Sequence, residues 1–197
     1  MWNRLRRTTA PSGDIVTLDQ AKAHLRVDFA DDDDIQDMIY EAVNVIDGPK
    51  GIGVALLPQS WVMSLDIWPN GSIIIPLGPI ISVDSIIYID PNGNEQTLDT
   101  SLYVYDLDTE PLYINRAFGV AWPASRYQIG SIKVNFTAGY ANADAIPSDF
   151  KRALKLLIGH WYKNREAVVG IESRDTPNDM PFAVESILER YRAGRIC

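Results

Sequence analysis

The sequence has little of what catalytic and metal centres are usually built from. Its 197 residues include one cysteine, Cys197, and two histidines, His24 and His160. A single cysteine cannot form an intrachain disulfide, so the fold does not depend on one. A zinc site needs more nitrogen and sulfur ligands than this chain offers. Cys197 has no partner nearby in the sequence that would make it a catalytic thiol.

Long apolar runs are also missing. No uncharged stretch stays apolar for the roughly 20 residues that a membrane helix needs. The arginines near the start are not followed by the apolar segment of a signal peptide. We therefore expect a soluble protein that makes no membrane contact.

Positive charge is absent from one long segment. Residues 28–47 hold eight acidic side chains and no basic one, and the whole chain has a net charge of -8 and a pI of about 4.7. This balance argues against a general nucleic-acid binder. Arginines gather instead near the two ends of the chain: Arg4, Arg6, Arg7, Arg190, Arg192 and Arg195.

The acidic segment contains FADDDDIQDMI, residues 29–39, which is best explained as the start of a helix. Apolar residues recur behind it at steps of three and four, as on one face of a helix: Ile35, Met38, Ile39, Ala42, Val43 and Ile46. Asp31 or Asp32 would be the N-cap, and the other aspartates would face the positive end of the helix dipole. An EF-hand starting at Asp31 fails, because Gln36 stands where Gly is needed and Ala42 where Glu is needed.

Helical periodicity brackets a region of strand patterns. Residues 18–26, 31–46, 149–164 and 182–193 have the helical spacing, whereas residues 58–140 alternate and contain Pro-Asn-Gly turns. The predicted fold class is α+β, a helical connector core of two N-terminal and two C-terminal helices with an inserted, mostly antiparallel β unit. The predicted units are a basic N-terminal arm (1–14), the first portion of the helical core (15–54), a β insertion (55–145), the second portion of the helical core (146–193) and a C-terminal tail (194–197).

The motifs of common enzyme classes are absent. No serine lies in a Gly-x-Ser-x-Gly elbow, and residues 48–53, GPKGIG, lack the Gly-Lys-Ser/Thr ending of a phosphate loop. We expect no enzyme, no catalytic residue, no cofactor and no metal. Two alternatives stay open: a small metal-dependent hydrolase that uses the Asp31–Asp37 cluster, and a monomeric adaptor domain that binds peptides at a sheet edge.

Three segments together carry a family likeness. They are TLDQAKAHLRVDFADDDDIQDMIYEAV (17–43), ALLPQSWVMSLDIWP followed by IPLGPIISVDSIIYIDPNG (55–69 and 75–93), and LKLLIGHWYKNREAVV (154–169), with Phe182-Ala183-Val184 near the end. In this order the chain resembles the head–tail connector (adaptor, head-completion) proteins of tailed bacteriophages and gene transfer agents. The likeness is to the variant with a β insertion between the helices, and it spans residues 15–193.

The resemblance implies structural work in a virion neck. Connector subunits of this kind form a ring of about twelve copies beneath the portal, through head-to-tail contacts that must close. The ring extends the DNA channel and presents a surface to a tail-side neck protein, a stopper or tail terminator. DNA would pass through without sequence-specific binding, and the protein would be assembled in the bacterial cytoplasm.

Three groups of residues are predicted to carry these contacts. The family resemblance implies that the C-terminal segment contacts the portal. This amphipathic segment offers Ile187, Leu188, Arg190, Tyr191, Arg192, Arg195 and Ile196. The broad apolar arc of residues 149–164 offers one half of a subunit interface: Phe150, Leu154, Leu156, Leu157, Ile158 and Trp161. The third group, Arg4, Arg6 and Arg7, is predicted to contact an acidic neighbour or DNA.

Overall fold

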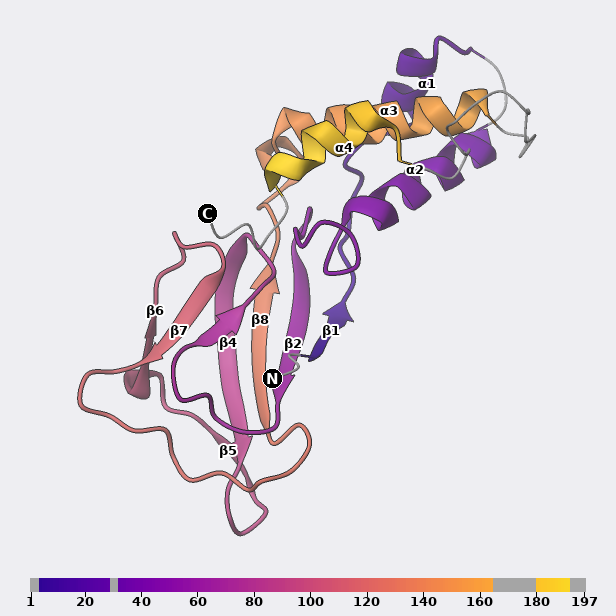
Figure 1. Cartoon of the computed structure of the whole chain (residues 1–197). Helices are drawn as coiled ribbons and strands as arrows, with labels where there is room; N and C mark the ends of the chain where they lie inside the picture. The colour runs from indigo at the N-terminus through magenta and orange to yellow at the C-terminus, as the bar shows by residue number, and fades with distance from the viewer. Residues whose placement is uncertain (1–3, 29–31, 165–179, 192–197) are drawn as a thin grey trace.

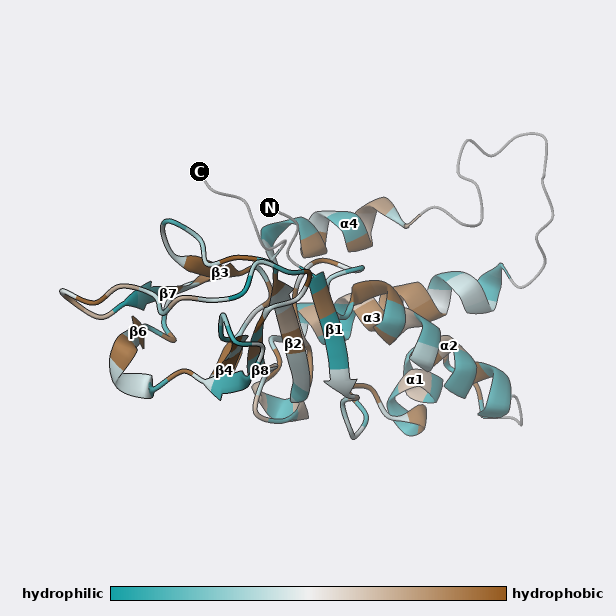
Figure 2. Ribbon diagram, turned by 90° about the horizontal axis from the view of Figure 1, so that it is seen from below, coloured by the Kyte–Doolittle hydropathy of each residue, from teal (hydrophilic) through white to brown (hydrophobic). Residues whose placement is uncertain are grey.

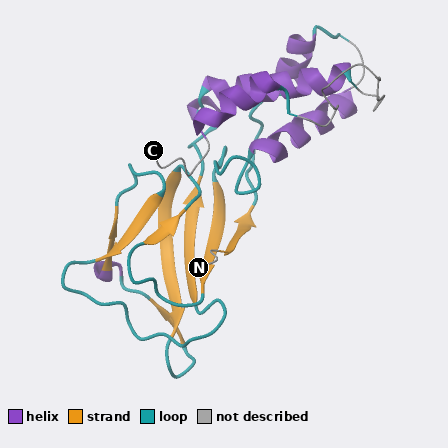
Figure 3. Cartoon of the chain, viewed as in Figure 1, coloured by secondary structure: helices purple, strands orange, loops and turns teal. Residues whose placement is uncertain are grey.

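The computed structural model describes residues 4–28, 32–164 and 180–191. The chain forms a helical region and a β region that lie end to end (Figures 1 and 3). The end of α2 (Asp32–Ile46) and the edge strand β1 (Arg4–Thr9) meet where the two regions join. None of the described helices is long and apolar enough to cross a membrane.

Four α-helices form the helical region of the described chain. They are α1 (Leu18–Leu25), α2 (Asp32–Ile46), α3 (Ser148–Lys163) and α4 (Phe182–Leu188), and a 3-10 turn (Glu189–Tyr191) continues α4. Helix α3 is central, because it packs against each of the other three. Thr17 caps α1, since its hydroxyl accepts a hydrogen bond from the Gln20 amide at 3.3 Å.

Among the residues that the structure describes, eight strands form two antiparallel sheets. The strands are β1 (Arg4–Thr9), β2 (Gln59–Leu65), β3 (Ile73–Ile75), β4 (Ile80–Ile89), β5 (Glu95–Thr97), β6 (Tyr103–Tyr105), β7 (Leu112–Arg116) and β8 (Ile132–Ala138). The larger sheet has the order β1-β2-β8-β4-β5 and the smaller one β3-β7-β6. Short 3-10 turns, Thr100–Leu102 and Ala143–Ala145, precede β6 and α3.

Each region has its own hydrophobic core. In β8 the residues alternate between buried and half-buried, so that Val134 and Phe136 point into the β core, opposite Met63 and Trp61 of β2. The helical core gathers the buried faces of α2 and α3 together with residues of the segments that enter and leave the sheet, among them Ile15 and Leu56.

The predicted fold class is wrong. The described chain has four helices and two antiparallel sheets, and the strands begin at β1, ahead of every helix, so this is not a helical core of N- and C-terminal helices with a β unit inserted between them. β1 was missed because its sequence, RLRRTT, is largely hydrophilic (Figure 2) and only Leu5 is half-buried. An edge strand needs only backbone hydrogen bonds on one side, so its side chains carry little hydrophobic signal.

Candidate interaction surfaces

Asp47 joins the two regions of the molecule. It follows the last residue of α2, and its buried carboxylate accepts hydrogen bonds from the Leu56 backbone N–H (2.8 Å) and from Gln59 Nε2 of β2 (2.9 Å to Oδ1). Arg7 of β1 donates to the other oxygen at 3.2 Å. One side chain therefore ties the end of α2 to two neighbouring strands.

Burial is the main influence on the charge of this carboxyl group. It raises the pKa of Asp47, whereas the hydrogen bonds from Leu56 and Gln59 and the positive charge of Arg7 act in the opposite direction. The oxygens are fully engaged by donors, so Asp47 serves as an acceptor that fixes geometry and is not placed as a free base.

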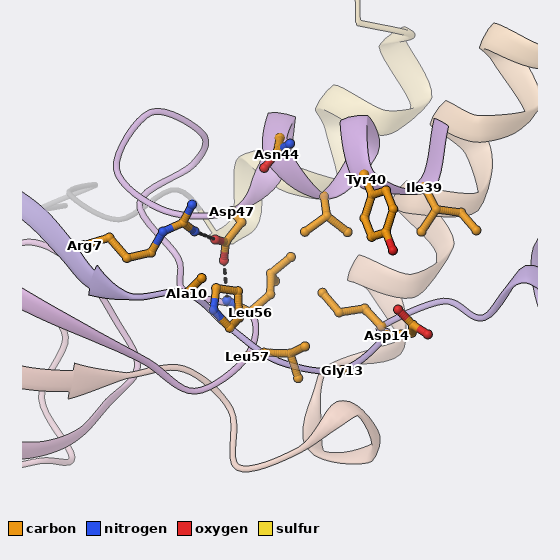
Figure 4. Close-up of a pocket in the computed structure, with 13 residues that line it drawn as sticks. Arg7, Ala10, Gly13, Asp14, Ile39, Tyr40, Asn44, Asp47, Leu56 and Leu57 are labelled. Carbon is orange, nitrogen blue, oxygen red and sulfur yellow. Dashed lines mark hydrogen bonds and ion pairs between the residues drawn. The ribbon is translucent and has the colours of Figure 1, made fainter. Parts of the chain in front are cut away.

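A pocket of about 230 Å³ opens beside this joint. Figure 4 shows Arg7 and Asp47 at one end and Tyr40 and Asp14 at the other, with Leu56 and Leu57 between them. Its described lining contains no serine, threonine, cysteine, histidine or lysine. The space suits one side chain or a few water molecules.

The C-terminal residues predicted to contact a portal are partly used within the chain. Leu188 is buried, and the Tyr191 ring lies 4.5 Å from the Phe150 ring of α3. Tyr191 Oη donates to Asp149 at 3.0 Å, and Arg190 pairs with the same carboxylate at 3.1 Å. Burial, followed by the hydrogen bond to Asp149, raises the pKa of Tyr191. Ile187 is half-buried, and Arg192, Arg195 and Ile196 lie outside the described residues.

The predicted subunit interface on α3 divides into two faces. Four of its members are buried in the helical core of the same chain: Phe150, Leu154, Leu157 and Ile158. Leu156 and Trp161 are only half-buried and retain surface for a neighbour. The width of the apolar arc is explained by the three helices packed around α3, so its buried side needs no second subunit.

The arginines of the predicted arm lie in β1. Arg4 pairs with Asp66, whose pKa is lowered mainly by the Gly130 backbone N–H and also by Arg4. Arg7 is occupied at Asp47 and lies over the Trp61 ring, whereas Arg6 is exposed and forms no ion pair with another described residue.

The aspartate run forms the first turn of α2. Asp32 pairs with Lys22 of α1 at 2.6 Å, and Asp33, Asp34 and Asp37 are exposed. Asp31 lies outside the described residues. In the portion of the chain that is described, no group of three or more acidic, histidine or cysteine side chains is arranged to hold a metal ion.

Sequence reasoning missed a set of exposed apolar side chains in the connection between β7 and β8. Phe118 is fully exposed, and Tyr127 and Ile129 are 85% and 80% exposed. The available signal was the group of large apolar residues from Phe118 to Ile129, in a segment that lacks the regular alternation of the neighbouring strands. Long loops of this kind often carry binding residues.

Two comparisons with known proteins bear on this geometry. Residues 112–192, from β7 to the turn after α4, match the model of the phage gp6-like head–tail connector proteins. The predicted resemblance to head–tail connector proteins is confirmed. No curated protein matches the chain significantly.

Solved structures similar to this chain come from gene transfer agent (GTA) particles. A chain in the neck of an empty particle, computed with C6 symmetry, is 25% identical, with a TM-score of 0.74. A chain in the virion of a native particle is 24% identical, with a TM-score of 0.76, and one in a native neck with C12 symmetry is 21% identical, with a TM-score of 0.69. Each comparison covers 98% of this chain and 97% of the other, and the last two concern the fold alone.

Proposed function

We propose that this chain is a structural head–tail connector subunit of a phage-type or GTA-type neck. The observation that carries the proposal is the likeness, over 98% of this chain, to a 25% identical chain from a particle neck, together with the connector-family match. The subunit forms a ring under the portal, extends the DNA channel and joins capsid to tail. It acts by covering surfaces of neighbouring proteins and needs neither catalysis nor a cofactor.

The charge of the chain supports passage of DNA without retention. DNA-binding proteins gain most of their non-specific affinity from Lys and Arg contacts to phosphates. Here the net charge is -8, and two arginines of β1 are neutralised by Asp66 and Asp47. Arg6 remains available to an acidic neighbour or to DNA.

The portal contact is proposed for the C-terminal segment. The internal packing of Leu188 and Tyr191 limits how this is tested, because removing residues 187–197 would expose the helical core. Removal of residues 192–197 alone spares those contacts. It deletes Arg192, Arg195 and Ile196, while Arg190 stays paired with Asp149.

The exposed residues of the β7–β8 connection support a contact with the tail-side neck protein. This connection runs around the end of the β region that is away from the helices (Figure 1), and so offers a surface separate from α4. An exposed aromatic such as Phe118 is typical of a binding surface.

Reconstitution tests the whole proposal. The full chain is mixed with purified portal from the same particle and imaged by electron microscopy. We expect the full chain to form a ring that binds the portal. The chain lacking residues 192–197 should fail to dock on the portal. A chain that stays monomeric with portal present, or a truncated chain that docks with unchanged affinity, would count against the respective element of the proposal.

A further inference from the structure

A groove lies on the surface of the helical region between α1, α3 and the start of α4. It encloses about 760 Å³ and combines apolar and basic side chains, among them Leu156, Arg26, His160 and Lys163. Arg26 and Lys163 are exposed and form no ion pair with any described residue. His160 Nε2 is buried without a hydrogen-bond partner in the described chain. The groove therefore offers positive charge and apolar surface that the described residues leave without a partner.

The outer face of α2 has complementary properties. Asp33, Asp34, Asp37 and Glu41 are exposed and form no ion pair within the described chain, and Tyr40 between them is 56% exposed. No basic residue occurs in α2, from Asp32 to Ile46. A helix with one apolar face buried and an acidic face carrying an exposed aromatic fits a groove that is basic and partly apolar.

These two surfaces cannot meet within one molecule. α2 and α3 pack against each other through their buried residues, Ile39 and Leu154 among them, so the opposite face of each helix is turned away from the contact. Figure 1 shows α1 along the upper side of the helical region and α2 along the lower side. An interaction between the acidic face and the groove would therefore join two copies of the chain in a head-to-tail manner.

We propose that the groove between α1, α3 and α4 binds the outer acidic face of α2 from a second copy of this chain, and that this contact links successive subunits. The inference rests on the proposed function and names the surfaces that its ring would use. A contact between two different patches leaves each patch free to bind the next copy, so it propagates and closes when the rotation allows.

Charge reversal in two matched variants tests the contact. One variant carries Asp37→Lys with Glu41→Lys, and the other carries Arg26→Glu with Lys163→Glu. In each, both meeting surfaces have the same sign, so we expect portal-bound rings to fall at least about tenfold. An equimolar mixture restores rings, because the reversed α2 face of one variant meets the reversed groove of the other. A control, Asp108→Lys with Glu110→Lys, makes the charge change of the first variant on exposed positions of the β region and keeps wild-type ring yield.

Disulfide trapping detects the same contact in the absence of portal. In a Cys197→Ser background, Glu41→Cys with Lys163→Cys in one chain should give a ladder of cross-linked multimers at high protein concentration, whereas either cysteine alone should give none beyond the random background. Rings that survive both reversals, together with no ladder, would overturn the proposed contact and leave the connector function standing. A chain that forms no ring on its portal but still gives the ladder would overturn the function and retain the contact.

Discussion

Replacement of Asp47 by alanine should destabilise the protein more than its small size suggests. The change leaves the buried Leu56 N–H and the Gln59 side-chain amide without their acceptor. An orphaned buried donor costs about 1–3 kcal/mol, so two cost about 2–6 kcal/mol. Alanine also removes a carboxylate whose raised pKa shows that burial disfavours its charge. We expect a net loss of about 2–4 kcal/mol in the free energy of unfolding.

Urea unfolding followed by tryptophan fluorescence measures this loss, since Trp61 lies beside Arg7 at the joint. An unchanged m-value would show that the same surface is exposed on unfolding. In thermal unfolding the expected loss corresponds to a fall in Tm of about 4–16 °C for a chain of this size.

The matched control is Asp47→Asn, which keeps an oxygen for the Leu56 N–H and lets the Gln59 amide turn to pair with it. We expect this variant to stay within about 1 kcal/mol of wild type. Equal stability of the alanine and asparagine variants would refute the reasoning, because it would mean that the two donors do not depend on an acceptor at position 47.

Three other predictions concern individual contacts. Burial raises the pKa of Asp47 in the folded state, so ionisation of this group destabilises the folded protein. The free energy of unfolding of wild type, relative to that of Asp47→Asn, should therefore fall as the pH rises from about 4 through the raised pKa. A relative free energy that rises over this range would contradict the prediction. Tyr191→Phe removes the hydrogen bond to Asp149 but keeps the ring packing, so chemical denaturation should show a loss of about 0.5–1.5 kcal/mol, and no loss would mean that water replaces the bond. Gly139→Ala places a methyl group 2.2 Å from a backbone oxygen at a φ of 130° and should cost about 3 kcal/mol or more, whereas Gly71→Ala meets nothing within 4 Å and should change stability by less than about 0.5 kcal/mol in the same assay.

The helices could be predicted closely because their signals are local. The apolar spacing from Ile35 to Ile46 matches α2, and the predicted helix 18–26 matches α1 (Leu18–Leu25) to within one residue. The strands of the hairpin-rich region were likewise expected from alternation and turns. These patterns depend on neighbours within a few residues, which a single sequence displays directly.

The arrangement of the two regions was not predictable in the same way. β1 depends on pairing with β2 across more than fifty residues, and the register Arg6↔Val62 leaves no trace in RLRRTT itself. In the sequence, Asp47 is only one of the eight acidic residues between positions 28 and 47. Its role depends on hydrogen-bond donors from Arg7, Leu56 and Gln59, which lie elsewhere in the chain. The predicted domain boundaries and contact residues remain predictions.

The joint also bears on how the molecule would carry a mechanical load. Three separate segments, residues 10–17, 47–58 and 139–147, run between the sheets and the helices, and Asp47 ties the second of them to Arg7 in β1, the strand that leads into the first. A force that pulls the helical region and the β region apart is shared among these three backbone segments at once. Rupture then requires several interactions to fail at the same time, and not one after another.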